Sequence, residues 1–205
     1  ALLGQFQNVM AMLTLLATGG INTGIVTQTA IHRDDVEQRT ALWRTAWRLM
    51  LGMSSLTGAL LWLFAPQVAQ YVLQDVHYAW LFRILAVSLV FIALQTLLLS
   101  VLNGLQEIPR YVAGNTLTSL TLGITVGSLT WFYGLPGALL GFGIYLALAG
   151  GVVWLLSIRR PWCHWNAFWG AWNPLLARQL GHFALMGLTS AVASPVALLF
   201  IRDHL

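Results

Sequence analysis

The chain has 205 residues, of which 58% are hydrophobic and only 8% charged, and its formal net charge is +4. Soluble domains carry about a quarter charged residues, so this composition excludes an ordinary soluble protein and indicates a polytopic, all-α membrane protein. All ten basic residues are arginines in short connections between hydrophobic runs, a distribution that indicates membrane topology rather than a nucleic-acid-binding surface.

The membrane spans are predicted from runs of apolar residues, because about 20 such residues cross a bilayer. These runs cover residues 1–31, 49–74, 84–106, 111–158 and 183–201. The fourth run is long enough for two spans, and YGLPG at 133–137, with one proline and two glycines, predicts the turn between them. We therefore expect six transmembrane helices. Because the chain stops directly after a hydrophobic segment, we also expect it to be part of a longer protein.

The arginines fall in alternate connections and so predict the orientation of the spans. One side carries Arg33, Arg39, Arg44, Arg48, Arg110, Arg159, Arg160 and Arg178, whereas the other carries Arg83 and Arg202. The positive-inside rule assigns the side with eight arginines to the cytoplasm.

The first span ends in an unusual stretch, GGINTGIV at 19–26, which is poor material for a helix interior. One interpretation is a close helix crossing, because glycine and threonine let membrane helices approach each other. The other is a loosened helix beside a water-filled cavity, with Asn22 turned into it, as in the discontinuous helices of transporters.

Polar residues recur at helical spacing in several spans. The stripes comprise Gln7, Thr14, Thr18 and Asn22; Arg44, Arg48, Gly52 and Ser55; Ser88, Gln95 and Asn103; and Tyr111, Asn115, Thr118, Thr125 and Ser128. Small and hydroxylated residues also serve helix packing. Packing alone does not call for glutamine and asparagine in several spans, so together the stripes favour a shared polar cavity.

Arg83 follows HYAWLF and enters a span from the predicted external side. An arginine at this depth either extends its guanidinium back to the headgroups or faces water or a partner. The functional alternative is an anion site, because guanidinium matches phosphate oxygens with two parallel hydrogen bonds.

The segment 159–182 differs from the other connections because Trp162, Trp165, Trp169 and Trp172 are spaced 3, 4 and 3 apart. This spacing places four indoles on one helical face. Tryptophan favours the membrane interface, so we interpret 159–182 as a cytoplasmic interfacial connector, with contact to a lipid substrate as the alternative.

Enzyme motifs are absent from the sequence. It has no lysine-containing phosphate loop, no HExxH zinc motif and no paired carboxylates in a large loop, and its five histidines are dispersed. The single cysteine, Cys163, lacks companions at metal-site spacing. We therefore predict no catalytic residues, no metal and no cofactor.

Three stretches together resemble a known family: LGQFQNVMAMLTLLATGGINTGIV, NGLQEIPRYVAGNTL and WNPLLARQLGHFALMGLTSAVASPVALLFIRDHL. In order and spacing they resemble the Wzx-type flippases of O-antigen and enterobacterial common antigen. These are polysaccharide members of the multidrug/oligosaccharidyl-lipid/polysaccharide exporter superfamily. The resemblance covers essentially all of the chain. One departure is Thr27, where many members carry a basic residue.

The resemblance implies a twelve-helix transporter of two six-helix lobes in the bacterial inner membrane. Residues 1–158 would form helices two to six of the first lobe, 159–182 the connector, and 183–205 the first helix of the second lobe. Such proteins, in lipopolysaccharide and polysaccharide biosynthesis, move undecaprenyl-pyrophosphate-linked oligosaccharide, either an O-antigen unit or enterobacterial common antigen lipid III, from the inner to the outer leaflet. Partners would be membrane lipids, a polysaccharide polymerase and a chain-length regulator.

The expected substrate-binding residues combine the stripes with this resemblance. We expect arginines to attract the pyrophosphate and neutral side chains to bond sugar hydroxyls; the set is Arg83, Arg48, Arg44, Asn22, Thr18, Asn115, Thr118 and Gln95. The alternatives are an exporter of a drug or another lipid-linked precursor, and a membrane polysaccharide polymerase. A drug exporter predicts carboxylates in mid-span, and a polymerase predicts a large external loop.

Overall fold

The computed structural model describes residues 2–158, Trp162, Phe168 and residues 173–186. Its elements are α1 (Leu2–Thr18), α2 (Asn22–Ile31), α3 (Val36–Leu63), α4 (Ala65–Leu73), the 3-10 turn η1 (Val76–Tyr78), α5 (Ala79–Gly104) and α6 (Ile108–Ser157). Residues 174–186 are also helical. Every regular element in these residues is a helix, which confirms the predicted all-α fold.

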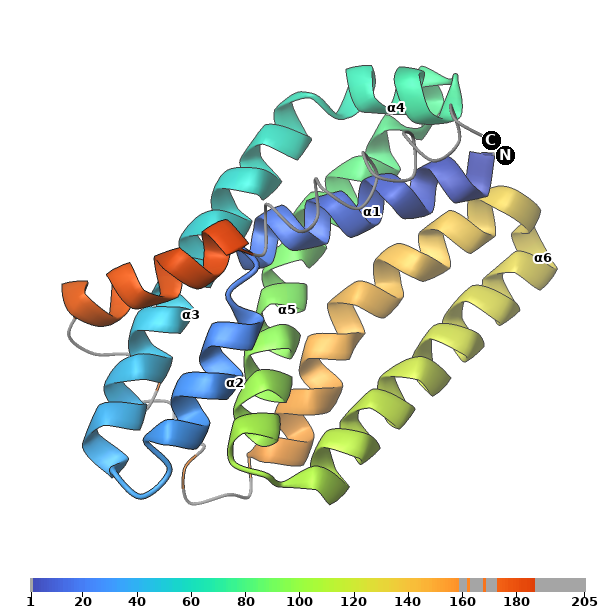
Figure 1. Ribbon diagram of the computed structural model, residues 1–205. Coiled ribbons are helices and arrows are strands. Elements are labelled where there is room, and N and C mark those ends of the chain that lie inside the picture. The colour runs from blue at the N-terminus through green and yellow to red at the C-terminus, as the bar shows by residue number, and fades with distance from the viewer. Residues whose placement is uncertain (1, 159–161, 163–167, 169–172, 187–205) are drawn as a thin grey trace, which may run out of the picture.

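Helix α5 is the centre of the bundle and packs against α1, α2, α3, α4 and α6 (Figure 1). The connections after α2 and α5 lie at one end, which we call the arginine-rich end because Arg33, Arg39 and Arg110 lie at or near these turns. The connection between α3 and α4 lies at the opposite end. This arrangement agrees with the predicted alternation of the spans.

Two of the predicted spans are broken helices. Helices α1 and α2 meet at a bend of 40°, where Gly19 and Gly20 adopt φ values of 62° and 63°. L-amino acids with a side chain rarely adopt this left-handed conformation, so glycine is required at the break. Helices α3 and α4 meet at a sharper bend of 72° at Phe64, two residues before Pro66 in the first turn of α4.

Helix α6 is a hairpin of two arms rather than one long rod (Figure 1). Its helical geometry is interrupted at Gly134, with φ 63° and ψ −140°, inside the predicted YGLPG turn. The two arms approach closely at Gly137 and Gly141, which have no side chain. A Cβ on Gly137 would meet the Leu129 carbonyl, and one on Gly141 would lie 2.7 Å from the Thr125 oxygen. The prediction of a turn at 133–137 is confirmed.

Helix length and composition identify several of the predicted spans. Within the described residues two helices are long and apolar enough to cross a membrane, or up to four if each bent pair forms one span. They include 76–104 and 136–157. The arm at 108–133 is helical but is not among these candidates, and most of the predicted sixth span, 183–201, lies outside the described residues.

The core consists of two clusters of buried apolar side chains stacked along α5. Towards the predicted external end, Phe82, Leu85 and Leu89 pack with residues of α1, α3 and α6. Towards the arginine-rich end, Leu97 and Val101 of α5 pack with residues of α2 and α3. Between these clusters, the break between α1 and α2 lies alongside the middle of α5, where the candidate site forms.

Candidate functional site

Two adjacent hollows lie beside the break between α1 and α2, and both are lined by Asn22 and Thr96. Their volumes are about 490 and 350 Å³. We call the two together the furrow. Its polar lining residues are Thr14, Thr18, Asn22, Thr23, Thr96, Ser100, Asn103 and Tyr111, contributed by α1, α2, α5 and α6.

The break between helices α1 and α2 leaves polar backbone groups exposed where the two hollows meet. Asn22 begins α2, and no side chain caps this terminus, since residue Ile21 stands at the N-cap position. The first amides of a helix have no partner within the helix and carry a partial positive charge. On the other side of the break, the Thr18 hydroxyl donates to the carbonyls of Thr14 and Leu15, at 2.9 and 3.3 Å. The amides at the start of α2, in contrast, receive no side-chain cap.

The polar groups in the furrow are uncharged, and they lie among apolar side chains that include Met10, Leu15, Val26, Leu99 and Phe142. Among the described residues that line it, the polar groups are hydroxyls and carboxamides, with no arginine, aspartate or glutamate. These groups both donate and accept hydrogen bonds, as sugar hydroxyls do. Their side chains contribute no full charge to balance a diphosphate.

Two of the eight predicted site residues line the furrow, namely Asn22 and Thr18. Asn22 is exposed, as expected of a side chain turned into an open hollow. The GGINTGIV stretch therefore interrupts the helix beside a hollow lined by Asn22, as the loosened-helix interpretation expects. The packing interpretation holds for Gly24, since a Cβ there would lie 2.8 Å from the ring of Phe183.

The other neutral predicted residues bond within the bundle. The Asn115 amide donates to the Tyr111 carbonyl at 3.0 Å. The Thr118 hydroxyl, which is buried, donates to the Gly114 carbonyl at 2.9 Å. The Gln95 side chain hydrogen-bonds with Tyr145. None of the three lines either hollow.

The three predicted arginines also lie apart from the lining of the furrow. Arg83 is exposed near the start of α5, with its guanidinium carbon 5.8 Å from the centre of the Trp62 ring. Arg48 is exposed and Arg44 half-buried on α3, towards the arginine-rich end. The structure thus separates the cationic and neutral members of the predicted set.

Thr96 and Ser100 were missed by the sequence reasoning, although with Asn103 they are spaced 4 and 3 apart on α5. The predicted stripe instead joined Asn103 to Ser88 and Gln95. Ser88 is buried and its hydroxyl donates to the Ile84 carbonyl at 3.0 Å and to the Gly143 carbonyl at 3.2 Å, so its role is packing. The shorter spacing of 96, 100 and 103 was the available signal.

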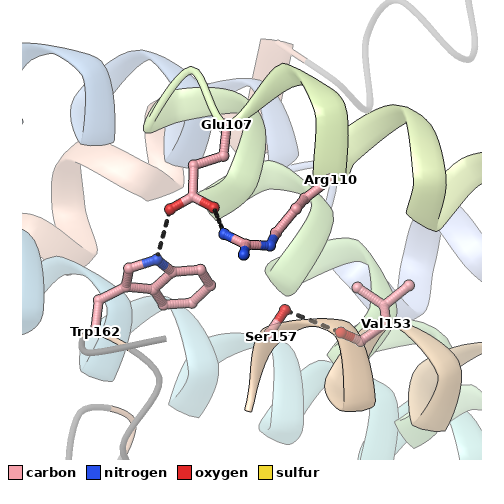
Figure 2. A network of polar contacts seen from close by, with 5 residues as sticks. All are labelled: Glu107, Arg110, Val153, Ser157 and Trp162. Atoms are coloured by element: carbon pink, nitrogen blue, oxygen red, sulfur yellow. Dashed lines mark hydrogen bonds and ion pairs between the residues drawn. The ribbon is translucent and has the colours of Figure 1, made fainter. Parts of the chain in front are cut away.

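Below the furrow, at the arginine-rich end, a polar network holds Trp162 against the bundle (Figure 2). The Trp162 indole N–H donates to Oε1 of Glu107 at 3.0 Å, and Arg110 pairs with Oε2 of the same carboxylate at 2.6 Å. Glu107 also supplies the carbonyl that accepts the Tyr111 amide, at 3.0 Å. Because Tyr111 lines the second hollow, this network borders the furrow.

Aromatic side chains also pack against Trp162. The Trp43 ring lies 5.6 Å from that of Trp162 and 6.4 Å from that of Phe168. The Trp43 indole N–H donates to the buried Thr29 hydroxyl at 3.1 Å. Of the predicted tryptophan face, only Trp162 falls within the described residues; Trp165, Trp169 and Trp172 lie outside them.

The chain is similar to known proteins along its whole length. Residues 1–196 match the family model described as polysaccharide biosynthesis protein. The whole chain is 30% identical to the lipid III flippase of Escherichia coli strain K12 and equally to that of Shigella flexneri. It spans 49% of each of these relatives, about half of their length. No solved structure matches the chain. With the family match covering nearly all of its length, the chain belongs to the polysaccharide biosynthesis protein family.

Proposed function

We propose that the protein containing this chain is a flippase that moves a lipid-linked oligosaccharide across the bacterial inner membrane, and that the furrow binds the sugar. The observation that carries the proposal is a furrow beside a broken membrane helix, whose polar lining groups are all uncharged hydroxyls and carboxamides. Two relatives that the chain matches over its full length are named lipid III flippases, which supports a transporter rather than an enzyme.

The chemistry of the furrow suits a sugar headgroup. Moving unpaired hydroxyl groups into hydrocarbon costs several kcal/mol each, so an oligosaccharide needs replacement hydrogen bonds on its path. Asn22 and Asn103 each offer a donor and an acceptor, and Thr96 and Ser100 offer hydroxyls. A partly open helix terminus at Asn22 adds backbone amides to this set.

The pyrophosphate requires positive charge that the furrow side chains do not supply. We retain Arg48 and Arg44 as its candidates, because they lie towards the predicted cytoplasmic end, where the lipid-linked substrate would enter. Arg83 is not part of the proposed substrate site, because it lies towards the predicted external end and contacts Trp62 of α3 rather than the furrow. The partial positive charge at the start of α2 would assist at the furrow itself.

The proposed transport cycle is alternating access between two lobes. In it, residues 1–158 form most of the first lobe and 159–182 the connector, with residues 183–205 beginning the second lobe. The chain spans about half of the relatives' length, which supports a second half of similar size. Association with a polysaccharide polymerase and a chain-length regulator stays a prediction.

The decisive experiment measures transport by the full-length protein in a flippase-null strain. Asn22→Leu and Asn103→Leu should each reduce complementation and cause lipid-linked oligosaccharide to accumulate on the cytoplasmic face, because each removes a donor and an acceptor. Asn22→Ser, which keeps a polar group at the start of α2, should restore part of the activity. Membrane abundance of each variant controls for folding. Full complementation by both leucine variants would contradict the assignment of the furrow.

A further inference from the structure

A second hollow lies between α3 and α5, on the side of α5 away from the furrow. Its volume is about 460 Å³, and its lining includes Gly58, Ala59, Trp62, Val87 and Phe91. Val87 and Thr96 are nine residues apart on α5, which is two and a half helical turns. The furrow and this hollow therefore occupy opposite faces of the same helix. We call this hollow between α3 and α5, which is separate from both hollows of the furrow, the outer groove.

The groove exists because small residues bring α3 and α5 together at its floor. A Cβ on Gly58 would lie 2.8 Å from the Ala86 carbonyl oxygen, so the two backbones are nearly in contact there. Ser55 and Ala59 continue this floor with little side-chain bulk, while Trp62 and Phe91 belong to its exposed lining. The lining is predominantly apolar, as expected of a surface that meets hydrocarbon.

A cation stands at the predicted external end of the groove. Arg83 lies three and four residues before Ala86 and Val87 and so shares their face of α5. Its guanidinium carbon is 5.8 Å from the centre of the Trp62 ring, and Trp62 lines the groove. Within the described part of the chain, Arg83 is exposed and forms no ion pair with a carboxylate. Its charge is therefore open to an anion from outside the protein.

The length of the groove indicates which anionic lipid fits. From Arg83 to Phe91, eight residues at about 1.5 Å each give about 12 Å along α5. One leaflet contributes about 15 Å of hydrocarbon to a bilayer core of about 30 Å. A phosphate at Arg83 would thus place one acyl chain along the groove within a single leaflet. An undecaprenyl chain is far longer than this groove.

We propose that the outer groove is a binding site for an anionic glycerophospholipid of the outer leaflet, with its phosphate on Arg83 and one acyl chain against Gly58, Ala59 and Val87. Guanidinium binds phosphate oxygens through two parallel hydrogen bonds, and the Trp62 ring holds it at the interface. This lipid is a structural ligand and not the transported substrate. The site would anchor the α3–α5 pair in the membrane while substrate is bound on the other face of α5.

The test is native mass spectrometry of the full-length protein with phosphatidylglycerol, phosphatidylcholine and undecaprenyl phosphate as probes. Wild-type protein should retain phosphatidylglycerol in preference to the other two. Arg83→Gln should lower this retention about five-fold, the scale of one partly exposed charge contact. Ala59→Phe, which fills the groove, should lower it without regard to headgroup. Arg178→Gln, at an exposed arginine of the 174–186 helix, is the matched control and should retain phosphatidylglycerol as wild type does.

A fluorescence measurement keeps the proposal testable if Arg83→Gln or Ala59→Phe fails to fold, because it uses neither variant. Phosphatidylglycerol with brominated acyl chains should quench Trp62, seen as the difference between wild type and Trp62→Phe, more strongly than brominated phosphatidylcholine. Equal quenching by the two lipids would overturn the headgroup assignment. Unchanged phosphatidylglycerol retention in Arg83→Gln and Ala59→Phe would overturn the site, and displacement of phosphatidylglycerol by equimolar undecaprenyl phosphate would overturn its occupant. Neither experiment measures transport, so failure here leaves the proposed flippase function unaffected.

Discussion

The two faces of α5 carry opposite chemistry although both belong to one hydrophobic helix. On the furrow face, Thr96, Ser100 and Asn103 present hydrogen-bonding groups towards a broken helix. On the groove face, Ala86 and Val87 meet α3 before its bend at Phe64. A face of a membrane span that borders a water-filled cavity needs hydrogen-bonding groups, whereas a face in hydrocarbon can be apolar.

Filling the furrow should have the largest functional effect, because Thr96 lies where its two hollows meet. Thr96→Leu replaces a hydroxyl with a larger apolar side chain, and one lost buried hydrogen bond corresponds to about 1–3 kcal/mol. We expect transport by the full-length protein to fall roughly ten-fold or more. The measurement is the initial rate at which lipid-linked oligosaccharide reaches the outer leaflet.

The matched control for this variant is Thr130→Leu. Thr130 is exposed on α6, and its hydroxyl bonds only the carbonyl of Val126 in its own helix among the described contacts. The same chemical change at this position should leave the transport rate within about two-fold of wild type. Equal loss in both variants would remove the functional distinction between the furrow and an ordinary helix surface.

On the groove side, the contact between α3 and α5 should be sensitive to a single methyl group. Gly58→Ala places a Cβ 2.8 Å from the Ala86 oxygen, so one helix must shift, at a cost of about 2 kcal/mol. We expect a lower thermal unfolding midpoint in detergent. Gly52→Ala, also on α3 but with no neighbouring atom within 4 Å of its Cβ, should keep or raise the midpoint. A midpoint for Gly58→Ala equal to that of Gly52→Ala would mean that the groove floor is not tightly packed.

The sequence predicted elements more fully than sites, and α5 shows why. Hydrophobic runs and the YGLPG turn have strong local signals, because a span must be apolar and a reversal needs residues that tolerate unusual backbone angles. Whether a polar side chain lines a cavity depends instead on what packs opposite it. Gln95 is hydrogen-bonded to Tyr145, whereas its neighbour Thr96 faces Asn22 across the furrow. Helical spacing alone does not distinguish these two outcomes.

The predicted arginines illustrate the same limit for charged groups. Arg83 and Arg48 each matched a phosphate-binding role by residue type. Phosphate binding depends on a shared position, whereas Arg83 lies in the first turns of α5 and Arg48 near the middle of α3. The helical break at Gly19 and Gly20, in contrast, was within reach of sequence reasoning, because two adjacent glycines followed by asparagine weaken a helix wherever they occur.

The network below the furrow should contribute a smaller amount of stability than the groove floor. Glu107→Gln removes the charge that pairs with Arg110 and weakens the bond from the Trp162 indole, a loss of about 1 kcal/mol for a half-buried group. We expect a modest fall in the unfolding midpoint and a red shift of the Trp162 emission, assigned with Trp162→Phe. An unchanged Trp162 emission in Glu107→Gln would show that contact with the Trp43 ring alone holds Trp162. The border of the furrow would then not depend on Glu107.

At the opposite end, Asp75 should have the smallest effect. Hydrogen bonds from the His77 backbone amide, at 2.9 Å, and from the His77 ring lower the pKa of the Asp75 carboxyl below its ordinary value of 3.8. The bonded form is the carboxylate, so any stabilisation of the turn before α5 is complete above the ordinary pKa and is lost as the pH falls through the lowered one. Asp75 should therefore titrate below 3.8 in carboxyl ¹³C spectra, with the resonance assigned by Asp75→Asn. Because the group is exposed, Asp75→Asn should leave both the furrow and groove assays within about two-fold of wild type. A titration midpoint at or above 3.8 would show that the turn leading towards Arg83 does not depend on the Asp75 cap.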